Sequence, residues 1–253
     1  MIRAFIFDLD GTLVQTEIMK AESYARAAVE LSNSVEFNDV ISTFKKLAGF
    51  SRKEVAEEIV ESFDLKKEAL ARADNYKVRK AWKVLVSIRM DIYNSMISNP
   101  ENIREHLCIY NFGLLKWARN HKYLTGLATQ SEFSQSKVIL EILDIESDFD
   151  CISTMDDIEN PKPDPEIYNL ISSRMGLSAS ECLVIEDSPA GIQSALNAGM
   201  GCIAVPNSFT REAVHKLGAL DEKWIVDSPR ELMKVAQNFL SERSELSDDL
   251  ILE

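Results

Sequence analysis

The sequence predicts an α/β protein with a doubly wound parallel sheet and an inserted all-helical cap domain. Two observations lead to this fold class. Short apolar runs recur along the chain and alternate, in its second half, with segments of helical periodicity, an order that is typical of a parallel sheet with crossover helices. More than 110 residues separate the first apolar run from the second. That is far more than a crossover needs, so the stretch must hold an insertion.

Five apolar runs are expected to form the strands. They are continuous rather than alternating, as expected for a parallel sheet that is covered on both faces. The runs are AFIF (4–7), YLTGLA (123–128), FDCIS (149–153), CLVIE (182–186) and GCIAV (201–205). Helical periodicity predicts helices over residues 133–143, 165–175, 189–198 and 229–242.

The insertion is predicted to be wholly helical. Within it, Ser51 and Glu54 have the spacing of a capping box at a helix start, and the long stretch 66–96 repeats at helical spacing. The expected boundaries are residues 15–97 for the helical domain, and 1–14 with 98–253 for the sheet domain.

Composition argues against polyanionic partners. The 253 residues include 41 acidic and 28 basic ones, a formal net charge of -13, so nucleic acid and an anionic membrane would be repelled overall. We find no apolar stretch long enough to span a membrane and no signal peptide. The four cysteines form no CxxC pair. We therefore expect a reduced, cytoplasmic protein with neither nucleic acid nor a membrane as partner.

The first strand ends on two carboxylates, Asp8 and Asp10, followed by a turn through Gly11 and Thr12. Ligands of open α/β sheets bind beyond the carboxyl ends of the strands. Because side chains alternate along an extended segment, both carboxylates can point to one side and share a divalent cation. Gly11 permits a tight turn whose N–H groups can face an anion. Taken alone, this short motif is equally compatible with two acids that only cap a loop.

Four motifs, in chain order, resemble those of the haloacid dehalogenase superfamily of phosphotransferases. The resemblance is carried by DLDGT (8–12), LATQS (127–131), PKPDPEIY (161–168) and VIEDSPAGIQSALNAGM (184–200). The insertion resembles the helical cap of the β-phosphoglucomutase-like members. The resemblance implies a Rossmann-like core, a cap domain and phosphoryl transfer.

By this resemblance, Asp8 is the nucleophile that forms an aspartyl-phosphate, a role that an already ionised carboxylate can fill. Asp10 would protonate the leaving oxygen and later deprotonate water. Thr129 and Lys162 would bind the oxygens of the transferred phosphoryl group.

A magnesium site is expected beside these residues. Glu186 and Asp187 end a buried strand, where two adjacent acids are costly unless they meet cations or backbone donors. Mg²⁺ prefers oxygen ligands. The expected ligands are the carboxylates of Asp8 and Asp187 and the carbonyl of Asp10, with Glu186 farther from the ion.

The remaining candidate residues would bind substrate. They are Gly11, Thr12, Gln130 and Ser131 in the sheet domain, and Lys20 and Arg52 in the helical domain. Arg52 could hold a distal anionic group of the substrate, although an exposed arginine at a helix start is an equally good interpretation.

The expected function is a Mg²⁺-dependent phosphatase that acts, as a monomer or weak homodimer, on a small phosphorylated metabolite such as a sugar phosphate or phosphoglycolate. The alternative is a sugar-phosphate mutase, but Lys20 and Ala48 stand where that pattern has a histidine and a lysine. A dehalogenase would not need Asp10. A noncatalytic binding protein on the same fold is a further alternative, which the complete set of reactive residues argues against.

Overall fold

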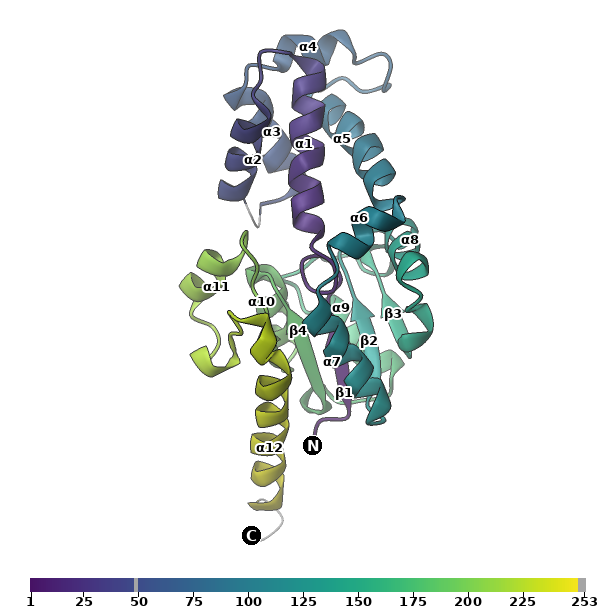
Figure 1. Ribbon diagram of the computed structural model, residues 1–253, viewed down its shortest axis with the longest axis vertical. Coiled ribbons are helices and arrows are strands. Elements are labelled where there is room, and N and C mark those ends of the chain that lie inside the picture. Colours follow the sequence, from purple (N-terminus) through teal and green to yellow (C-terminus); the bar gives the residue numbers. More distant parts are fainter. Residues whose placement is uncertain (48–49, 250–253) are drawn as a thin grey trace. The chain divides into compact units, whose positions relative to one another are not determined.

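The structure is a computed structural model that describes residues 1–47 and 50–249. The chain divides into two compact units. The sheet unit consists of Met1–Gln15 and Ile103–Glu253, and the helical unit consists of Thr16–Asn102. The two units are connected twice, because the helical unit is inserted between the first strand and the rest of the sheet unit (Figure 1).

A five-stranded, all-parallel sheet forms the centre of the sheet unit (Figure 1). The strand order is β3-β2-β1-β4-β5. The strands are β1 (Ala4–Phe7), β2 (Leu124–Ala128), β3 (Cys151–Ser153), β4 (Cys182–Glu186) and β5 (Gly201–Ala204). Each lies within one of the five predicted apolar runs, and the predicted fold class is confirmed.

Both faces of the sheet are covered by helices. On one face, the ring of Phe5 contacts the rings of Trp117 and Tyr123 edge-on, with centroid distances of 6.2 Å and 5.1 Å. On the other face, Ile6 lies in a buried cluster with Ile171 and Ile192. Successive residues of β1 therefore pack into different cores, which explains why its sequence is apolar throughout.

Six helices of the sheet unit follow along the chain within residues 106–249. They are α7 (Ile109–Asn120), α8 (Phe133–Leu143), α9 (Glu166–Arg174), α10 (Pro189–Asn197), α11 (Arg211–Leu217) and α12 (Leu232–Asp249). Of these, α8, α9 and α10 match the predicted ranges, α12 begins at Leu232 rather than at residue 229, and α7 and α11 were not predicted. Short 3-10 segments are η1 (Glu146–Asp148), η2 (Met155–Asp157), η3 (Ala179–Glu181), η4 (Glu222–Trp224) and η5 (Pro229–Glu231). Ser188 caps α10 by accepting a hydrogen bond from the N–H of Gly191, and Pro189 occupies the first turn.

The described part of the helical unit, residues 16–47 and 50–102, contains five helices and the start of a sixth. They are α1 (Thr16–Leu31), α2 (Phe37–Lys46), α3 (Arg52–Ser62), α4 (Lys66–Ala71), α5 (Ala81–Ile97) and α6 (Pro100–Glu105), the last of which contains the boundary between the units. The predicted capping box is present, because the side chains of Ser51 and Glu54 each accept the other's backbone N–H.

The periodic stretch 66–96 forms two helices, α4 and α5, which are separated by a turn. The chain turns between α4 and α5, where Lys77 has a φ of 53°. A left-handed residue cannot continue a right-handed helix. Apolar spacing on both sides of the turn matches one helical pattern, so periodicity alone did not reveal the break.

The core of the helical unit contains a buried arginine. Arg89 of α5 is 4% exposed, and its guanidinium lies over the rings of Tyr24 and Tyr93, at 5.1 Å and 4.6 Å from their centroids. Burial lowers the pKa of Arg89 from its usual value. The two aromatic faces offset part of the cost of removing this charge from water.

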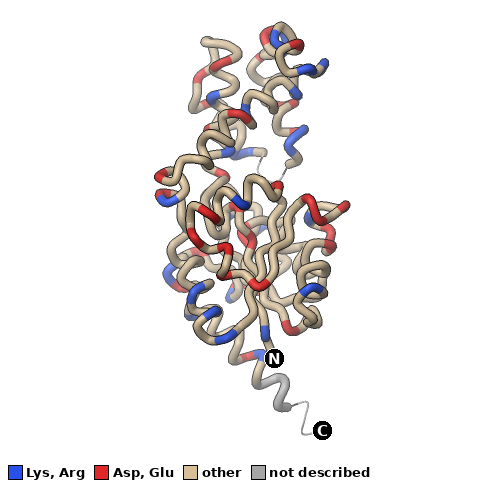
Figure 2. The backbone as a smooth tube through the Cα atoms, turned by 90° about the vertical axis from the view of Figure 1, so that its right-hand side faces the viewer, with Lys and Arg blue, Asp and Glu red and all other residues tan. Residues whose placement is uncertain are grey.

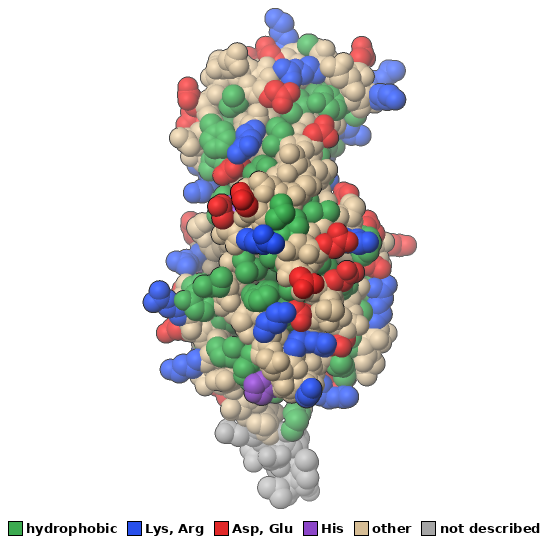
Figure 3. All heavy atoms as spheres, turned by 45° about the vertical axis from the view of Figure 1, so that its right-hand side comes forward, with side chains coloured by type: hydrophobic (Ala, Val, Ile, Leu, Met, Phe, Trp, Pro, Cys, Tyr) green, Lys and Arg blue, Asp and Glu red, His purple; other side chains and the backbone are tan. Residues whose placement is uncertain are grey.

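Charged side chains are spread along the chain. Figure 2 shows Lys and Arg interspersed with Asp and Glu along the backbone, and the face in Figure 3 mixes charged and hydrophobic side chains. The net negative charge is therefore not gathered in one patch on that face. Within residues 1–47 and 50–249, no helix has the length and apolar character needed to cross a membrane.

Truncating a buried side chain of the central strand β1 should have a large effect on stability. We expect Ile6→Ala to lower the free energy of unfolding by about 2–5 kcal/mol, because the side chain is fully buried and its loss leaves a cavity. Ile109→Ala is the matched control, since Ile109 is 63% exposed and should change stability by about 0.5 kcal/mol or less. Urea unfolding followed by circular dichroism measures both. Equal midpoints for the two variants would contradict this packing.

Candidate active site

The candidate residues gather where the strand order of the sheet reverses. In the sheet, β2 and β3 lie on one side of β1, and β4 and β5 lie on its other side. Ligands of such sheets usually bind at this switch point, beyond the carboxyl ends of the central strands. Asp8 follows β1, Thr129 follows β2 and Asp187 follows β4, so sequence-distant motifs meet at one edge.

Lys162 is the centre of the cluster. Its Nζ donates hydrogen bonds to Asp8 Oδ1 at 2.7 Å, to Glu186 Oε1 at 2.6 Å and to the carbonyl oxygen of Ala128 at 3.0 Å. An ammonium group has three donors, and all three are used. Lys162 is only 7% exposed, so the interpretation of an ordinary surface lysine is excluded.

Glu186 is held from all sides. Its Oε1 also accepts from the Tyr168 hydroxyl at 3.0 Å. Its Oε2 accepts from the N–H of Asp187 at 3.0 Å, and from both the N–H and the hydroxyl of Ser188 at 3.1 Å. A Cβ on Gly191 would lie 1.8 Å from Glu186 Oε1, so the carboxylate needs a glycine there. A metal ion at Glu186 would compete with five hydrogen bonds.

Three carboxylates form a group that could hold a metal ion. Oxygens of Asp8, Glu186 and Asp187 all lie within 4.8 Å of one another. Lys162 is paired with two of them, and when all are ionised the three carboxylates and Lys162 together carry a formal charge of -2. A divalent cation would balance that charge, and an all-oxygen donor set suits Mg²⁺, so the residues fit the predicted ion. The carboxylate of Asp10 is not part of this group within the described residues.

Asp187 is positioned by its neighbours. The side-chain amide of Asn207 donates to Asp187 Oδ2 at 2.7 Å, and the Thr12 hydroxyl donates to Oδ1 at 3.4 Å. Gly11 has a φ of +86°, and a Cβ there would lie 2.3 Å from Asp187 Oδ2. Gly11 is therefore required both for the left-handed turn and for the close approach of the carboxylate.

Asp10 contacts the loop after β2. Its Oδ2 accepts from the Ser131 hydroxyl at 2.6 Å and from the Thr129 hydroxyl at 3.0 Å. The N–H of Ser131 donates to Thr129 Oγ1 at 3.0 Å. Thr129 and Ser131, which were predicted to bind phosphate, thus form hydrogen bonds with Asp10, the predicted general acid and base. Gln130, between them in the chain, is half-buried. The contact of these residues with a phosphate stays a prediction.

Burial changes the acidity of the predicted nucleophile. Desolvation raises the pKa of Asp8 to about 7, and the neighbouring Glu186 and Asp10 carboxylates add to the effect, although the Lys162 ammonium opposes it. Burial by itself would lower the pKa of Lys162, but the Asp8 and Glu186 carboxylates raise it above the usual value. Lys162 is therefore charged, and a further cation beside Asp8 would lower the pKa of that carboxyl and favour its ionised form.

Two amides hold the turn after β1. Gln15 Nε2 donates to the carbonyl oxygen of Gly11 and to Cys108 Sγ, both at 3.0 Å. Asn111 Nδ2 donates to the carbonyl oxygen of Thr12 at 2.6 Å. Burial raises the pKa of Cys108 to about 11, so it is a neutral thiol. These contacts fix the loop that carries Asp10.

Sequence reasoning did not select Tyr168, Asn207, Gln15 or Asn111 for the site. Tyr168 lies inside a motif that was noted, but an apolar helix face does not distinguish a hydrogen-bonded tyrosine from a packing residue. Asn207 had a usable signal, because it follows the apolar run 201–205 at the edge where ligands bind. Gln15 and Asn111 act through main-chain carbonyls, which leave no sequence pattern.

Two predicted substrate-binding residues lie elsewhere in the chain. Lys20 and Arg52 belong to the helical unit, where Lys20 pairs with Glu17 at 2.7 Å and the carbonyl oxygen of Arg52 accepts from the Tyr24 hydroxyl at 3.4 Å. Their roles toward a substrate stay predictions. Ala48 lies outside the described residues.

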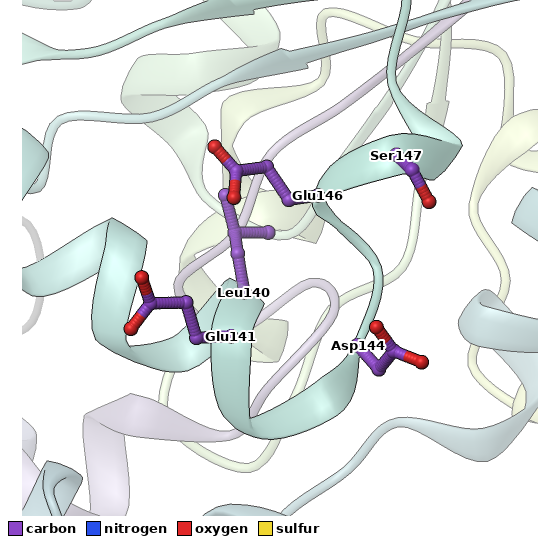
Figure 4. Close-up of a pocket in the computed structure, with 5 residues that line it drawn as sticks. All are labelled: Leu140, Glu141, Asp144, Glu146 and Ser147. Carbon is purple, nitrogen blue, oxygen red and sulfur yellow. The ribbon is translucent and has the colours of Figure 1, made fainter.

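A surface hollow of about 430 Å³ lies at the end of α8 (Figure 4). No candidate site residue lines it; its walls are Leu140, Glu141, Asp144, Glu146 and Ser147. Three acidic side chains would repel a phosphorylated ligand. The hollow is therefore not the site of the predicted chemistry, which lies at the strand ends.

The fold and the site together define an α/β enzyme whose buried lysine and carboxylates stand at the switch point of a parallel sheet. The chain belongs to the haloacid dehalogenase-like hydrolase family, whose model matches residues 5–205. The predicted resemblance is thereby confirmed.

Similarities to individual proteins are consistent with this family. The chain is 31% identical over 210 residues to the "Putative phosphatase YhcW" of Bacillus subtilis, covering 83% of this chain and 86% of the relative. It is 27% identical over 199 residues to the "Phosphorylated carbohydrates phosphatase" of Thermotoga maritima, covering 79% and 82%. A crystal structure of β-phosphoglucomutase from Clostridium difficile has the same fold, with a TM-score of 0.66, 24% identity and full coverage of both chains.

The contact between Gly11 and Asp187 predicts a specific glycine requirement. We expect Gly11→Ala to lower the free energy of unfolding by about 2 kcal/mol, because the residue is left-handed and its Cβ would overlap the carboxylate. Gly113→Ala is the control: a Cβ there meets no atom within 4 Å, and alanine favours a helix by about 0.5–1 kcal/mol. Urea unfolding of both variants measures the difference. A Gly11→Ala protein as stable as Gly113→Ala would contradict the contact.

Asp8 makes stability depend on pH when no metal ion is bound. Because its pKa rises from 3.8 to about 7 on folding, the folded chain holds this proton more tightly than the unfolded chain. The resulting stabilisation is complete below the unfolded value and is lost as the pH rises through 7. We expect Asp8→Asn, which has no proton to lose at this position, to gain in melting temperature relative to the parent as the pH rises from 5 to 8.

Thermal melts in a chelator, at several pH values between 5 and 8, test this dependence. Added Mg²⁺ should reduce the gain of Asp8→Asn relative to the parent at pH 8, since a cation offsets the charge of Asp8. A difference in melting temperature that stays constant over this pH range would show that Asp8 is not the titrating group.

Proposed function

We propose that this protein is a Mg²⁺-dependent phosphatase that hydrolyses a small phosphorylated metabolite, of the sugar phosphate or phosphoglycolate type, through an aspartyl-phosphate. The observation that carries the proposal is the buried contact of Lys162 with Asp8 and Glu186, beside Asp187. It combines a carboxylate nucleophile with charge that can neutralise a phosphoryl group. The relatives named as phosphatases, one of them for phosphorylated carbohydrates, support the substrate class.

Asp8 is the proposed nucleophile. Lys162 holds its Oδ1 at 2.7 Å and so fixes the orientation of the carboxylate before it attacks phosphorus. Asp8, Asp187 and the carbonyl of Asp10 would hold Mg²⁺, with Glu186 farther away. When bound, the ion offsets the repulsion among these carboxylates and neutralises charge on the phosphate.

Asp10 is the proposed general acid and base. It gives its proton to the oxygen of the leaving alcohol, and then takes a proton from the water that attacks the aspartyl-phosphate. The hydroxyls of Thr129 and Ser131 hold its Oδ2, which fixes the orientation of the carboxylate. Lys162 and Thr129 would also bind oxygens of the phosphoryl group.

Substrate selection is assigned to the helical unit. We place the cap domain at residues 15–97, with Lys20 and Arg52 as cationic groups for the substrate's polar or anionic parts. Gly11, Thr12, Gln130 and Ser131 would bind the phosphate on the sheet unit. No second subunit is needed for this chemistry, so a monomer or weak homodimer is sufficient.

Phosphate release tests the proposal. In the presence of excess Mg²⁺, the parent should release phosphate from at least one member of a panel of sugar phosphates, phosphoglycolate and nucleotides. Asp8→Asn should lose about 10³-fold or more of the rate, because the nucleophile is gone. A chelator should abolish the parent's activity. Asp8→Asn hydrolysis at the parental rate would rule out the aspartyl-phosphate route.

The same assay separates the phosphatase from the sugar-phosphate mutase. Both α- and β-hexose 1-phosphates are supplied with a hexose bisphosphate primer, and product sugars and free phosphate are measured together. The phosphatase releases phosphate from the ester. Isomerised hexose phosphate without phosphate release would instead identify a mutase, although Lys20 replaces the histidine of that pattern.

A further inference from the structure

Asn207 is a buried amide beyond the segment that the family model matches. It lies three residues after β5 and is 8% exposed, whereas the match ends at residue 205. Strand β5 pairs with β4, with Ala204 opposite Glu186. The register of the sheet therefore brings the segment after β5 beside Asp187, the residue that follows β4.

The orientation of the Asn207 amide is decided by its contacts. Its Oδ1 accepts from the backbone N–H of Phe209 at 2.8 Å, and a backbone N–H can only donate. The other end of the amide is therefore Nδ2, which donates to Asp187 Oδ2 at 2.7 Å. Its own N–H donates to Thr210 Oγ1 at 3.1 Å. Asn207 is thus anchored to its own loop while it points one donor at a candidate metal ligand.

We propose that Asn207 is the positioning residue for Asp187: its side-chain amide fixes the rotation of that carboxylate and so prepares Asp187 Oδ1 to bind the divalent cation. The inference rests on the proposed Mg²⁺-dependent function and adds a residue that the motifs do not contain. Holding Oδ2 leaves Oδ1 only one direction, so less conformational freedom is lost when the ion binds. Thr12 contacts Oδ1 at a longer 3.4 Å and does not replace this restraint.

A purely structural role for Asn207 predicts something different. The contacts with Phe209 and Thr210 stabilise the loop before α11 whether or not a metal ion binds. Asn207→Ser separates the two roles, because a serine hydroxyl can also accept from the N–H two residues on but is too short to reach Asp187. Thr210→Val is the matched control, since it removes the hydroxyl that accepts from Asn207 N–H and leaves the contact with Asp187 in place.

The test measures Mg²⁺ binding to the full-length protein through the rise in melting temperature, and in parallel the Mg²⁺ dependence of phosphate release. We expect Asn207→Ser to need about 10-fold or more Mg²⁺ for half of either effect, as for other residues that orient metal ligands. Its turnover at saturating Mg²⁺ should return to within about threefold of the parent, because the ligands themselves are intact. Thr210→Val should show the parental Mg²⁺ dependence.

Two results would overturn the inference. One is a parental Mg²⁺ midpoint in Asn207→Ser, and the other is an equal weakening in Thr210→Val, which would reduce Asn207 to a loop residue. A failure of the proposed function is distinguishable, because the parent itself would then show neither a Mg²⁺-dependent melting temperature nor phosphate release. That outcome would overturn the inference as well.

Discussion

The buried ion pair of Lys162 with Asp8 and Glu186 is the interaction on which the rest of the site depends. Burying charge is costly unless every donor and acceptor is satisfied, and Lys162 meets this condition with three hydrogen bonds. Its acceptors come from the ends of β1, β2 and β4. One ammonium group therefore joins three strand ends, and any shift of a strand would leave a buried charge without its partner.

This ion pair is unbalanced, and the imbalance links stability to function. Lys162 pairs with two of three carboxylates whose oxygens lie within 4.8 Å of one another, so these four groups together carry excess negative charge when ionised. Without a metal ion, burial raises the pKa of Asp8 to about 7, and the neighbouring Glu186 and Asp10 carboxylates add to the rise. The arrangement that makes the site ready for a divalent cation and a phosphate is thus a destabilising one in their absence.

The three carboxylates have different capacities for a ligand. Glu186 accepts five hydrogen bonds, from Lys162, Tyr168, Asp187 and two groups of Ser188. Asp8 and Asp187 are the two carboxylates whose side chains are proposed to bind the metal ion. Glu186 anchors the lysine, while the other two are candidates for chemistry. Glu186 and Asp187 are neighbouring acids in the sequence, so the sequence does not reveal that they have different roles.

The sequence by itself determined the strands of the sheet and the family, because continuous apolar runs and motifs in chain order are local patterns that can be recognised without coordinates. It did not determine the break within residues 66–96, since apolar spacing is the same on both sides of the turn. Only the tertiary structure decided the partners: Lys162 meets Asp8 across 154 positions, and Asn207 reaches Asp187 through the pairing of β5 with β4. A hydrogen bond needs its two atoms within about 3 Å, and folding alone sets that distance.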